Sequence, residues 1–257
     1  MFDGGREDGA CGAPAGPEAP AGPEAPTGPE APTGPVAPAG PVAPAGPVAP
    51  AGPEAPAGLE ALAAGLRALP PSCGPVRLVA VDGHAGSGKS TFAARLARAL
   101  GGAPVLHLDD IATHRELFAW TDRLRAQVLD PFARGEAARY RPYDWSARRF
   151  GPARVLPPAP VVLVEGVGAG RRALRPRLAR LLWMERAAEE SWRRGRHRDG
   201  PGQSAFWDGW TVAETRHFAH DPSLPFADLL IRECAEGYMW LPRHLPAADP
   251  EPVRHTR

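Results

Sequence analysis

The sequence predicts an α/β fold: a five-stranded parallel sheet with helices on both faces, preceded by a disordered arm rich in Pro, Ala and Gly. From residue 76 onwards, short apolar segments rich in β-branched residues alternate with segments of helical periodicity. This alternation is typical of parallel sheets covered by helices. A glycine-rich loop also joins the first apolar segment to the first helical one. The expected strands are 76–82, 103–110, 159–166, 179–185 and 226–232.

The arm is a low-complexity repeat over residues 14–56, with proline at every third position and glycine at every sixth. Polyproline II has three residues per turn, so the prolines would line one edge of an extended helix, whereas collagen would need glycine at every third position. The repeat lacks large apolar residues for a core, so we expect a disordered spacer. The alternative is a proline-motif ligand for an aromatic groove. The predicted division is an arm at 1–58, a main domain at 59–241 and a tail at 242–257.

The main domain is expected to begin with a short amphipathic helix, because leucines recur at helical spacing from Leu59 to Leu69. The first strand follows as VRLVAVD (76–82), and the helix after the glycine loop covers 90–100. A further helix carries an apolar face from Leu117 to Phe132.

The loop after the first strand, VDGHAGSGKST, matches the phosphate-binding pattern of a glycine followed after four residues by Gly-Lys-Ser. Its glycines let backbone N–H groups turn inward and hold phosphate oxygens at the positive end of the following helix. The motif predicts a P-loop NTPase that binds ATP with Mg²⁺. The residues expected to bind the nucleotide are Gly83, His84, Ala85, Gly86, Ser87, Gly88, Lys89, Ser90 and Thr91.

Lys89 is the only lysine in the chain. A lysine is a compact charge on a flexible stem that can follow the β- and γ-phosphates, which the planar fork of an arginine cannot do as well. We therefore expect Lys89 to be catalytic, and the Ser90 hydroxyl to bind Mg²⁺. His84 is interpreted as a variable position of the loop.

Composition excludes several classes of protein. The net charge is +1, no apolar run approaches 18 residues, and the N-terminus has no apolar segment of the signal-peptide kind. The three cysteines fit no metal or disulfide pattern. We therefore expect a cytoplasmic protein with neither a membrane nor a nucleic acid as partner, and the sequence leaves its oligomeric state open.

The residues at the ends of the predicted strands distinguish three classes of P-loop protein, which are GTP switches, motor ATPases and phosphotransferases. GTP switches need an Asn-Lys-x-Asp motif, and this chain contains no Asn. In motor ATPases a strand ends in Asp-Glu. In VVLVEG the strand ends in Glu165, which Gly166 follows, so only a single carboxylate is present, suited to positioning Mg²⁺. A transferase needs a carboxylate facing the γ-phosphate. Asp109 is the better candidate, because in an alternating strand it shares a face with His107, while Asp110 would cap the next turn.

The domain from Val76 to about Glu233 resembles the uridine kinase family of small-molecule P-loop kinases. The resemblance is carried, in the family's order, by VDGHAGSGKST, LHLDDI, LDPFARGEAARYRPYDWSARR and VVLVEG. It implies that Asp109 is the catalytic base and that Glu165 lies on the metal side. The family's Phe-Tyr pair after the base is Ile111-Ala112 here.

The resemblance also implies residues that contact the acceptor. Tyr143 and Asp144 match the family's Pro-x-Tyr-Asp segment, and Arg148 stands near the family's base-contacting His. Asp122 is the nearest match to its ribose-binding Asp.

A mobile arginine lid is expected in EESWRRGRHRDG (189–200), with Gly195 and Gly200 as hinges. Resemblance to the family's lid favours Arg194 and Arg198 as catalytic residues that stabilise charge on the moving phosphoryl group. The alternatives are a solvated helix end and a nucleic-acid patch.

The predicted function is transfer of the ATP γ-phosphate to a hydroxyl of a small acceptor, and the resemblance favours a nucleoside as that acceptor. One alternative is a nucleoside-monophosphate kinase, for which Arg141, Arg148 and Arg149 would form a second phosphate pocket. The other is a non-catalytic ATP-binding sensor whose proline arm recruits a partner.

Overall fold

The computed structural model describes residues 58–243. The expected arm and tail fall almost wholly outside the described residues, so the division of the chain into arm, domain and tail stays a prediction.

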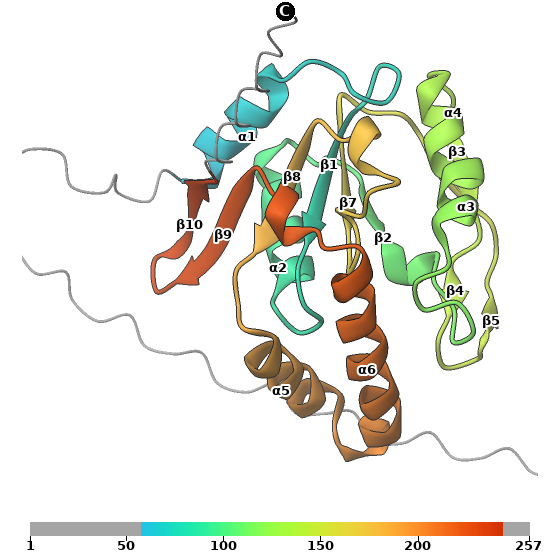
Figure 1. Ribbon diagram of the computed structural model, residues 1–257. Coiled ribbons are helices and arrows are strands. Elements are labelled where there is room, and N and C mark those ends of the chain that lie inside the picture. The colour runs from blue at the N-terminus through green and yellow to red at the C-terminus, as the bar shows by residue number, and fades with distance from the viewer. Residues whose placement is uncertain (1–57, 244–257) are drawn as a thin grey trace, which may run out of the picture. The chain divides into compact units, whose positions relative to one another are not determined.

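The centre of the fold is a six-stranded sheet in the order β10-β9-β8-β1-β7-β2 (Figure 1). Five neighbouring strands run parallel, as the sequence predicts. These are β1 (Arg77–Asp82), β2 (Val105–His107), β7 (Val161–Glu165), β8 (Arg180–Met184) and β9 (Leu229–Cys234). A sixth strand, β10 (Gly237–Pro242), pairs antiparallel with β9 and was not predicted. The two-residue turn of Ala235 and Glu236 returns the chain along β9, and Gly237, the first residue of β10, has a φ of 130°.

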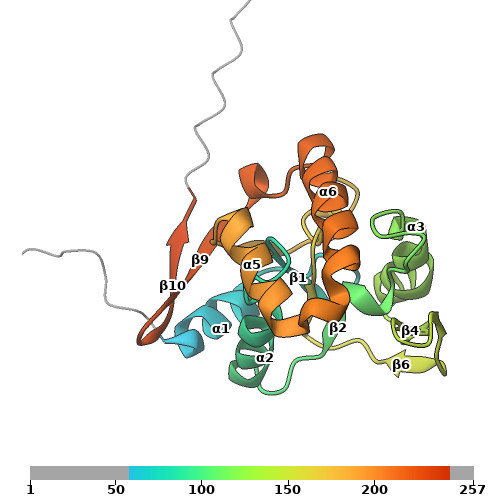
Figure 2. The same cartoon turned by 90° about the horizontal axis from the view of Figure 1, so that it is seen from below.

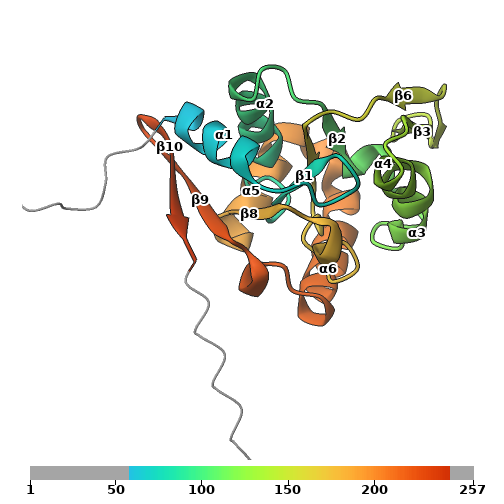
Figure 3. The same cartoon turned by 90° about the horizontal axis from the view of Figure 1, so that it is seen from above.

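Helices cover both faces of this sheet, as the sequence predicts. One face carries α1 (Leu59–Ala68) and α2 (Lys89–Ala99), which lie side by side in Figure 3. The other face carries a helical run made of α3 (Thr121–Leu124), a π-helical segment (Arg125–Leu129) and α4 (Asp130–Ala133). Figure 2 looks at the carboxyl edge of the strands, where α5 (Ala188–Asp199) and α6 (Ser204–His220) lie.

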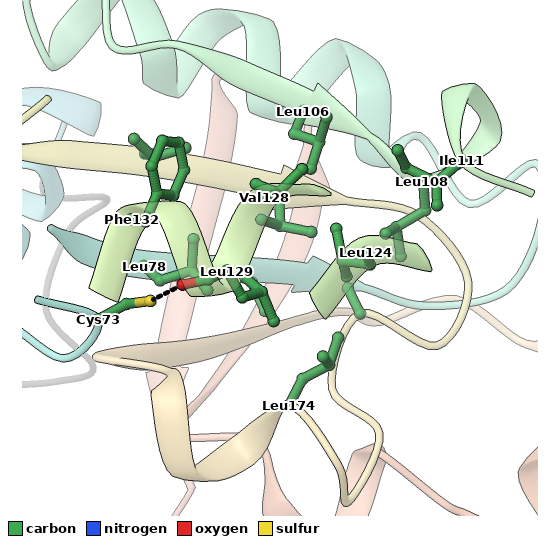
Figure 4. Close-up of a cluster of buried hydrophobic side chains, with 14 of the residues drawn as sticks. Cys73, Leu78, Leu106, Leu108, Ile111, Leu124, Val128, Leu129, Phe132 and Leu174 are labelled. Atoms are coloured by element: carbon green, nitrogen blue, oxygen red, sulfur yellow. Dashed lines mark hydrogen bonds between the residues drawn. The ribbon is translucent and has the colours of Figure 1, made fainter. Parts of the chain in front are cut away.

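The core on the α3–α4 face joins the sheet to this helical run (Figure 4). Leu78 and Leu106 from the strands pack with Leu124, Val128 and Phe132 from the helices, and all five are nearly fully buried. The Cys73 thiol donates a hydrogen bond to the Leu129 carbonyl over 3.3 Å. Burial of this thiol raises its pKa. Cys73 is thus a structural residue of the core.

Two small antiparallel strand pairs lie beyond this helical run. β3 (Ala138–Tyr140) pairs with β6 (Arg154–Leu156), and β4 (Tyr143–Asp144) pairs with β5 (Arg149–Phe150). The turn between β4 and β5 includes Arg148, a non-glycine residue at a positive φ of 51°. The β4–β5 hairpin places Trp145 next to the carboxyl end of β2, where its indole N–H donates to the Asp109 carbonyl over 3.0 Å.

The second predicted strand is shorter than expected. The strand ends at His107, and Leu108–Asp110 form a 3₁₀ turn closed by a 2.9 Å hydrogen bond from the Ile111 N–H to the Leu108 carbonyl. The alternation that placed Asp109 on the face of His107 therefore does not apply. The fifth strand is also shifted, because Leu224–Phe226 form a 3₁₀ turn before β9 begins.

Within residues 58–243, no helix is long and apolar enough to cross a membrane. The cytoplasmic location stays a prediction.

Candidate functional site

The glycine loop runs from the end of β1 to the start of α2, as the motif requires. Gly86 shows why a glycine is needed there. Its φ is 84°, and a Cβ atom on it would lie 2.0 Å from the Ser191 carbonyl oxygen. The loop thus packs directly against the backbone of α5, with no side chain between them.

Asp82, the last residue of β1, is hydrogen-bonded to the backbone of the phosphate loop. Its fully buried carboxylate accepts hydrogen bonds from the N–H groups of Gly83 (2.7 Å), Gly168 (2.8 Å) and Gly170 (2.8 Å). Burial raises the pKa of this carboxyl group, although the backbone donors oppose the shift. The carboxylate joins the phosphate loop to the segment after β7, a role the sequence reasoning missed.

Lys89 and Ser90 begin α2 and face the carboxyl end of β7. The Lys89 ammonium donates to the His84 carbonyl over 2.9 Å, and only 7% of the residue is exposed. The Ser90 hydroxyl donates to Glu165 over 3.1 Å, and Nδ1 of His107 lies 2.5 Å from the same carboxylate oxygen. Burial acts to raise the pKa of Glu165, but the His107 hydrogen bond and the Lys89 charge outweigh it and lower the pKa. The Glu165 hydrogen bond in turn raises the pKa of His107.

Ser90 and Glu165 form an oxygen donor pair that fits Mg²⁺. Mg²⁺ prefers oxygen ligands and usually takes only one or two protein groups, the rest being water and phosphate oxygens. A hydroxyl 3.1 Å from an ionised carboxylate at the end of the phosphate loop meets this requirement.

Asp109 opens onto the same site from the turn after β2. Its side chain is exposed to the cavity. Desolvation by nearby protein atoms, with repulsion from Glu165, raises the pKa of Asp109, and Lys89 and His107 oppose the shift. Asp110 instead points away, toward Arg154 (3.3 Å) and the Tyr140 hydroxyl (3.4 Å).

These groups line one cavity of about 460 Å³. Its phosphate end is formed by Ala85, Gly86, Lys89 and Ser90, and Asp109 and Glu165 lie beside them. Its other walls carry aromatic rings from three segments of the chain. These are His114, Trp145, Phe206, Trp207 and Trp210. The sequence reasoning did not find this wall, because its residues lie far apart in the chain.

The two predicted lid arginines have different surroundings. The expected lid is helix α5, and Arg198 near its end lines the cavity and pairs with Asp199 over 2.6 Å. Arg194 forms an ion pair with Glu233 of β9 over 3.3 Å and is not among the cavity-lining residues. The structure therefore brings Arg198, but not Arg194, to the cavity.

None of the predicted acceptor residues is among the residues that line the cavity; these are Tyr143, Asp144, Asp122 and Arg148. The Tyr143 hydroxyl is 3.0 Å from Nδ1 of His114, which does line the cavity. Asp144 accepts the N–H of Ala147 over 2.8 Å and so closes the β4–β5 turn that holds Arg148. The Asp122 side chain is 89% exposed and pairs with Arg125 on its own helical run. Thr91, which was predicted to bind the nucleotide, is exposed on the first turn of α2.

Gly195 was expected to act as a hinge, and this is wrong. It lies inside α5, where a Cβ atom would be 2.2 Å from the buried Trp207 ring of α6. Its small size permits close packing of two helices. Gly200, at the end of α5 with a φ of 76° and open space around it, is the residue at which the chain turns.

Gly195→Ala is expected to lower the free energy of unfolding by about 1–3 kcal/mol, because the added methyl group overpacks the Trp207 ring. In an unobstructed helix the same change would stabilise by roughly 1 kcal/mol. Gly209→Ala in α6, where nothing lies within 4 Å, is the matched control and should not destabilise. Urea unfolding measures both. Equal effects at the two positions would contradict the packing.

His217 of α6 is partly buried beneath the site, stacked on Phe118 at a centroid distance of 4.5 Å. Burial and the charge of Arg171 lower its pKa to about 4, although Asp221 and Glu214 oppose the shift. In the unfolded chain the ring binds a proton near the ordinary histidine pKa of 6.5, so the neutral ring contributes stability that is fully present above that pH. This contribution is lost as the pH falls toward the folded pKa.

His217→Phe should therefore flatten the pH dependence of stability. Between neutral pH and about pH 5, the wild-type protein is expected to lose roughly 1–2 kcal/mol that the variant retains, the lower end allowing for solvent around the partly exposed ring. Stacking on Phe118 is preserved in the variant. Urea unfolding at the two pH values gives the difference, and the exposed His220→Gln serves as the control. Parallel curves for wild type and His217→Phe would show that the pKa of His217 is the same in the folded and the unfolded protein.

Comparison with known proteins gives a structural likeness and no sequence match. No family model matches the chain, and no curated protein matches it significantly. Among solved structures, the chain is similar to a possible uridine kinase from Bacillus stearothermophilus, with a TM-score of 0.50 and 17% identity over 67% of this chain and 96% of that one. It is also similar to a proposed fructose transport system kinase from a Silicibacter species, with a TM-score of 0.42 and 22% identity over 65% of this chain and 90% of that one. The parallel sheet, the glycine loop between β1 and α2 and the first of these likenesses together show that this chain has the fold of the P-loop kinases.

Proposed function

We propose that the protein is an ATP-dependent kinase that transfers the γ-phosphate to a hydroxyl of a small acceptor, with a nucleoside as the favoured class. The observation that supports this most strongly is the position of Asp109. Its carboxylate opens into the cavity lined by Lys89, Ser90 and Glu165, between the phosphate loop and the aromatic wall.

The phosphate loop would bind the triphosphate through its N–H groups and Lys89. The Lys89 ammonium has three N–H donors, so it would keep its bond to the His84 carbonyl and donate the other two to the β- and γ-phosphates. Ser90 and Glu165 would hold Mg²⁺, which supplies neutralisation of phosphate charge when bound. Arg198, at the cavity, would add positive charge on the side of α5.

Asp109 would orient the acceptor hydroxyl and take its proton, while the acceptor oxygen bonds to the γ-phosphorus and ADP leaves. The raised pKa of Asp109 makes it a better proton acceptor than an aspartate of ordinary pKa. Asp110 does not compete for this role, because it is paired with Arg154.

The aromatic wall supports a flat acceptor. Trp145, Phe206 and Trp210 offer ring faces and edges on which a planar base can stack. Burial, together with the charge of Arg148, lowers the pKa of His114, so its ring is neutral at physiological pH. A wall of uncharged rings suits a nucleoside better than an anion.

The test is a screen for ADP release from Mg·ATP with nucleosides, nucleoside monophosphates, sugars and other small alcohols. We expect turnover with at least one neutral nucleoside. Turnover with monophosphates alone would identify a nucleoside-monophosphate kinase. Tight ATP binding without ADP release in the presence of every acceptor would favour the sensor.

A further inference from the structure

Glu214 of α6 is a fully buried carboxylate to which neither the sequence nor the proposed chemistry gives a role. It receives four hydrogen bonds. Their donors are Nδ1 of His84 (2.7 Å), the N–H of Ala85 (3.2 Å), the indole N–H of Trp192 (3.0 Å) and the indole N–H of Trp210 (2.7 Å). Two donors belong to the phosphate loop, one to α5 and one to α6.

The carboxylate is ionised at neutral pH. Burial acts to raise the pKa of Glu214, but the His84 hydrogen bond and the charge of Lys89 outweigh it and lower the pKa. An ionised carboxylate only accepts hydrogen bonds, so Nδ1 of His84 carries the hydrogen. A buried charge is tolerated when donors surround it in this way.

The contacts of Glu214 extend in two directions. Toward the nucleotide, it fixes His84, whose carbonyl receives the Lys89 ammonium over 2.9 Å. Toward the acceptor, it holds Trp210, whose ring lines the cavity. A single side chain thus joins the residue that positions Lys89 to the wall on which an acceptor would bind. Figure 2 shows α6 running across the carboxyl edge of the sheet, where this connection is made.

We propose that Glu214 is a positioning residue that couples the aromatic wall of the cavity to the phosphate loop. The position of the Trp210 ring would then affect nucleotide affinity through Glu214 and His84. The proposal rests on the proposed function, which assigns the two ends of the cavity. It also gives His84 a role: the ring holds the loop in register with α6, and the carbonyl of the same residue holds Lys89.

The first measurement is the Kd of Mg·ADP by calorimetry, which needs no acceptor. Glu214→Gln keeps the side-chain volume but places an amide N–H₂ group against N–H donors, and it should raise the Kd about tenfold or more. Glu190→Gln on the surface of α5 is the matched control and should leave the Kd unchanged. An unchanged Kd in folded Glu214→Gln would overturn the proposal.

The coupling itself is tested by a double-variant cycle. Trp210→Phe keeps a ring on the wall but loses the N–H that bonds Glu214. It should raise the Mg·ADP Kd several-fold in the wild type and have little further effect in Glu214→Gln, whereas Trp240→Phe on β10 should change neither. Additive effects, or no effect of Trp210→Phe alone, would show that Glu214 only fills a structural role.

Two further outcomes distinguish a failure of the coupling from a failure of the proposed function. If Glu214→Gln does not fold, the same cycle is run with His84→Ala, the next residue in the connection, and the same non-additivity is expected. If the wild-type protein binds no Mg·ADP at all, the proposed function is wrong, and the coupling is wrong with it.

Discussion

Lys89→Ala is expected to lower turnover of ATP by about 10³-fold, in the range found when a charge-stabilising group of a transition state is removed. The loss is expected because Lys89, the only lysine of the chain, lines the same cavity as Ser90, Glu165 and Asp109. The melting temperature should change by only a few degrees, since Lys89 makes a single hydrogen bond, to the His84 carbonyl.

Lys89→Arg is the matched variant, because it keeps the charge but replaces the flexible ammonium by a planar fork. It too should lose most of its turnover. Steady-state ADP release with the acceptor found in the screen measures both variants. Activity above a few per cent of wild type in Lys89→Ala would remove this residue from the reaction.

Asp109→Asn is expected to lower kcat by about 10²–10⁴-fold while the Kd of ATP stays within a few-fold, because an asparagine keeps the shape but cannot accept the hydroxyl proton. Asp110→Asn is the natural control, since Asp110 points to Arg154 and Tyr140 instead of the cavity. A larger loss in Asp110→Asn than in Asp109→Asn would reverse the assignment.

The pH profile gives a second check on Asp109. The ionised carboxylate is the active form, so wild-type activity should fall as the pH falls through a pKa that desolvation and Glu165 have raised above the ordinary value of 3.8. The residual activity of Asp109→Asn should lack this limb. An unchanged acid limb in the variant would assign it to another group.

The parts of the fold that depend on local pattern could be predicted from the sequence. Each parallel strand is a short apolar run, and the glycine loop is found between a strand and a helix. The predicted parallel sheet and the predicted helix after the loop, α2, are therefore confirmed. The register around Asp109 could not be predicted, because a strand and a 3₁₀ turn are not distinguished by three residues such as Leu108–Asp110.

The parts of the site that depend on contacts distant in sequence were not predictable. Glu214 lies 130 residues from His84, and nothing in its local sequence distinguishes it from the other acidic residues of a polar helix surface. Asp82 meets Gly168 and Gly170 only when β1 and β7 are paired in the sheet. The aromatic wall likewise forms only when the β4–β5 hairpin and α6 are both in place.

Only some rings of the aromatic wall are hydrogen-bonded, and this has a consequence for how the acceptor preference of the proposed kinase could change. Trp210 is hydrogen-bonded to the carboxylate that holds the phosphate loop, whereas Phe206, on the same helix and the same cavity, has no polar group to commit. Gln203, in the turn before α6, also lines the cavity. Substitutions at Phe206 and Gln203 break no hydrogen bond to the phosphate loop, so for the proposed kinase we expect these two positions to change acceptor preference at a smaller cost in nucleotide affinity than Trp210 would.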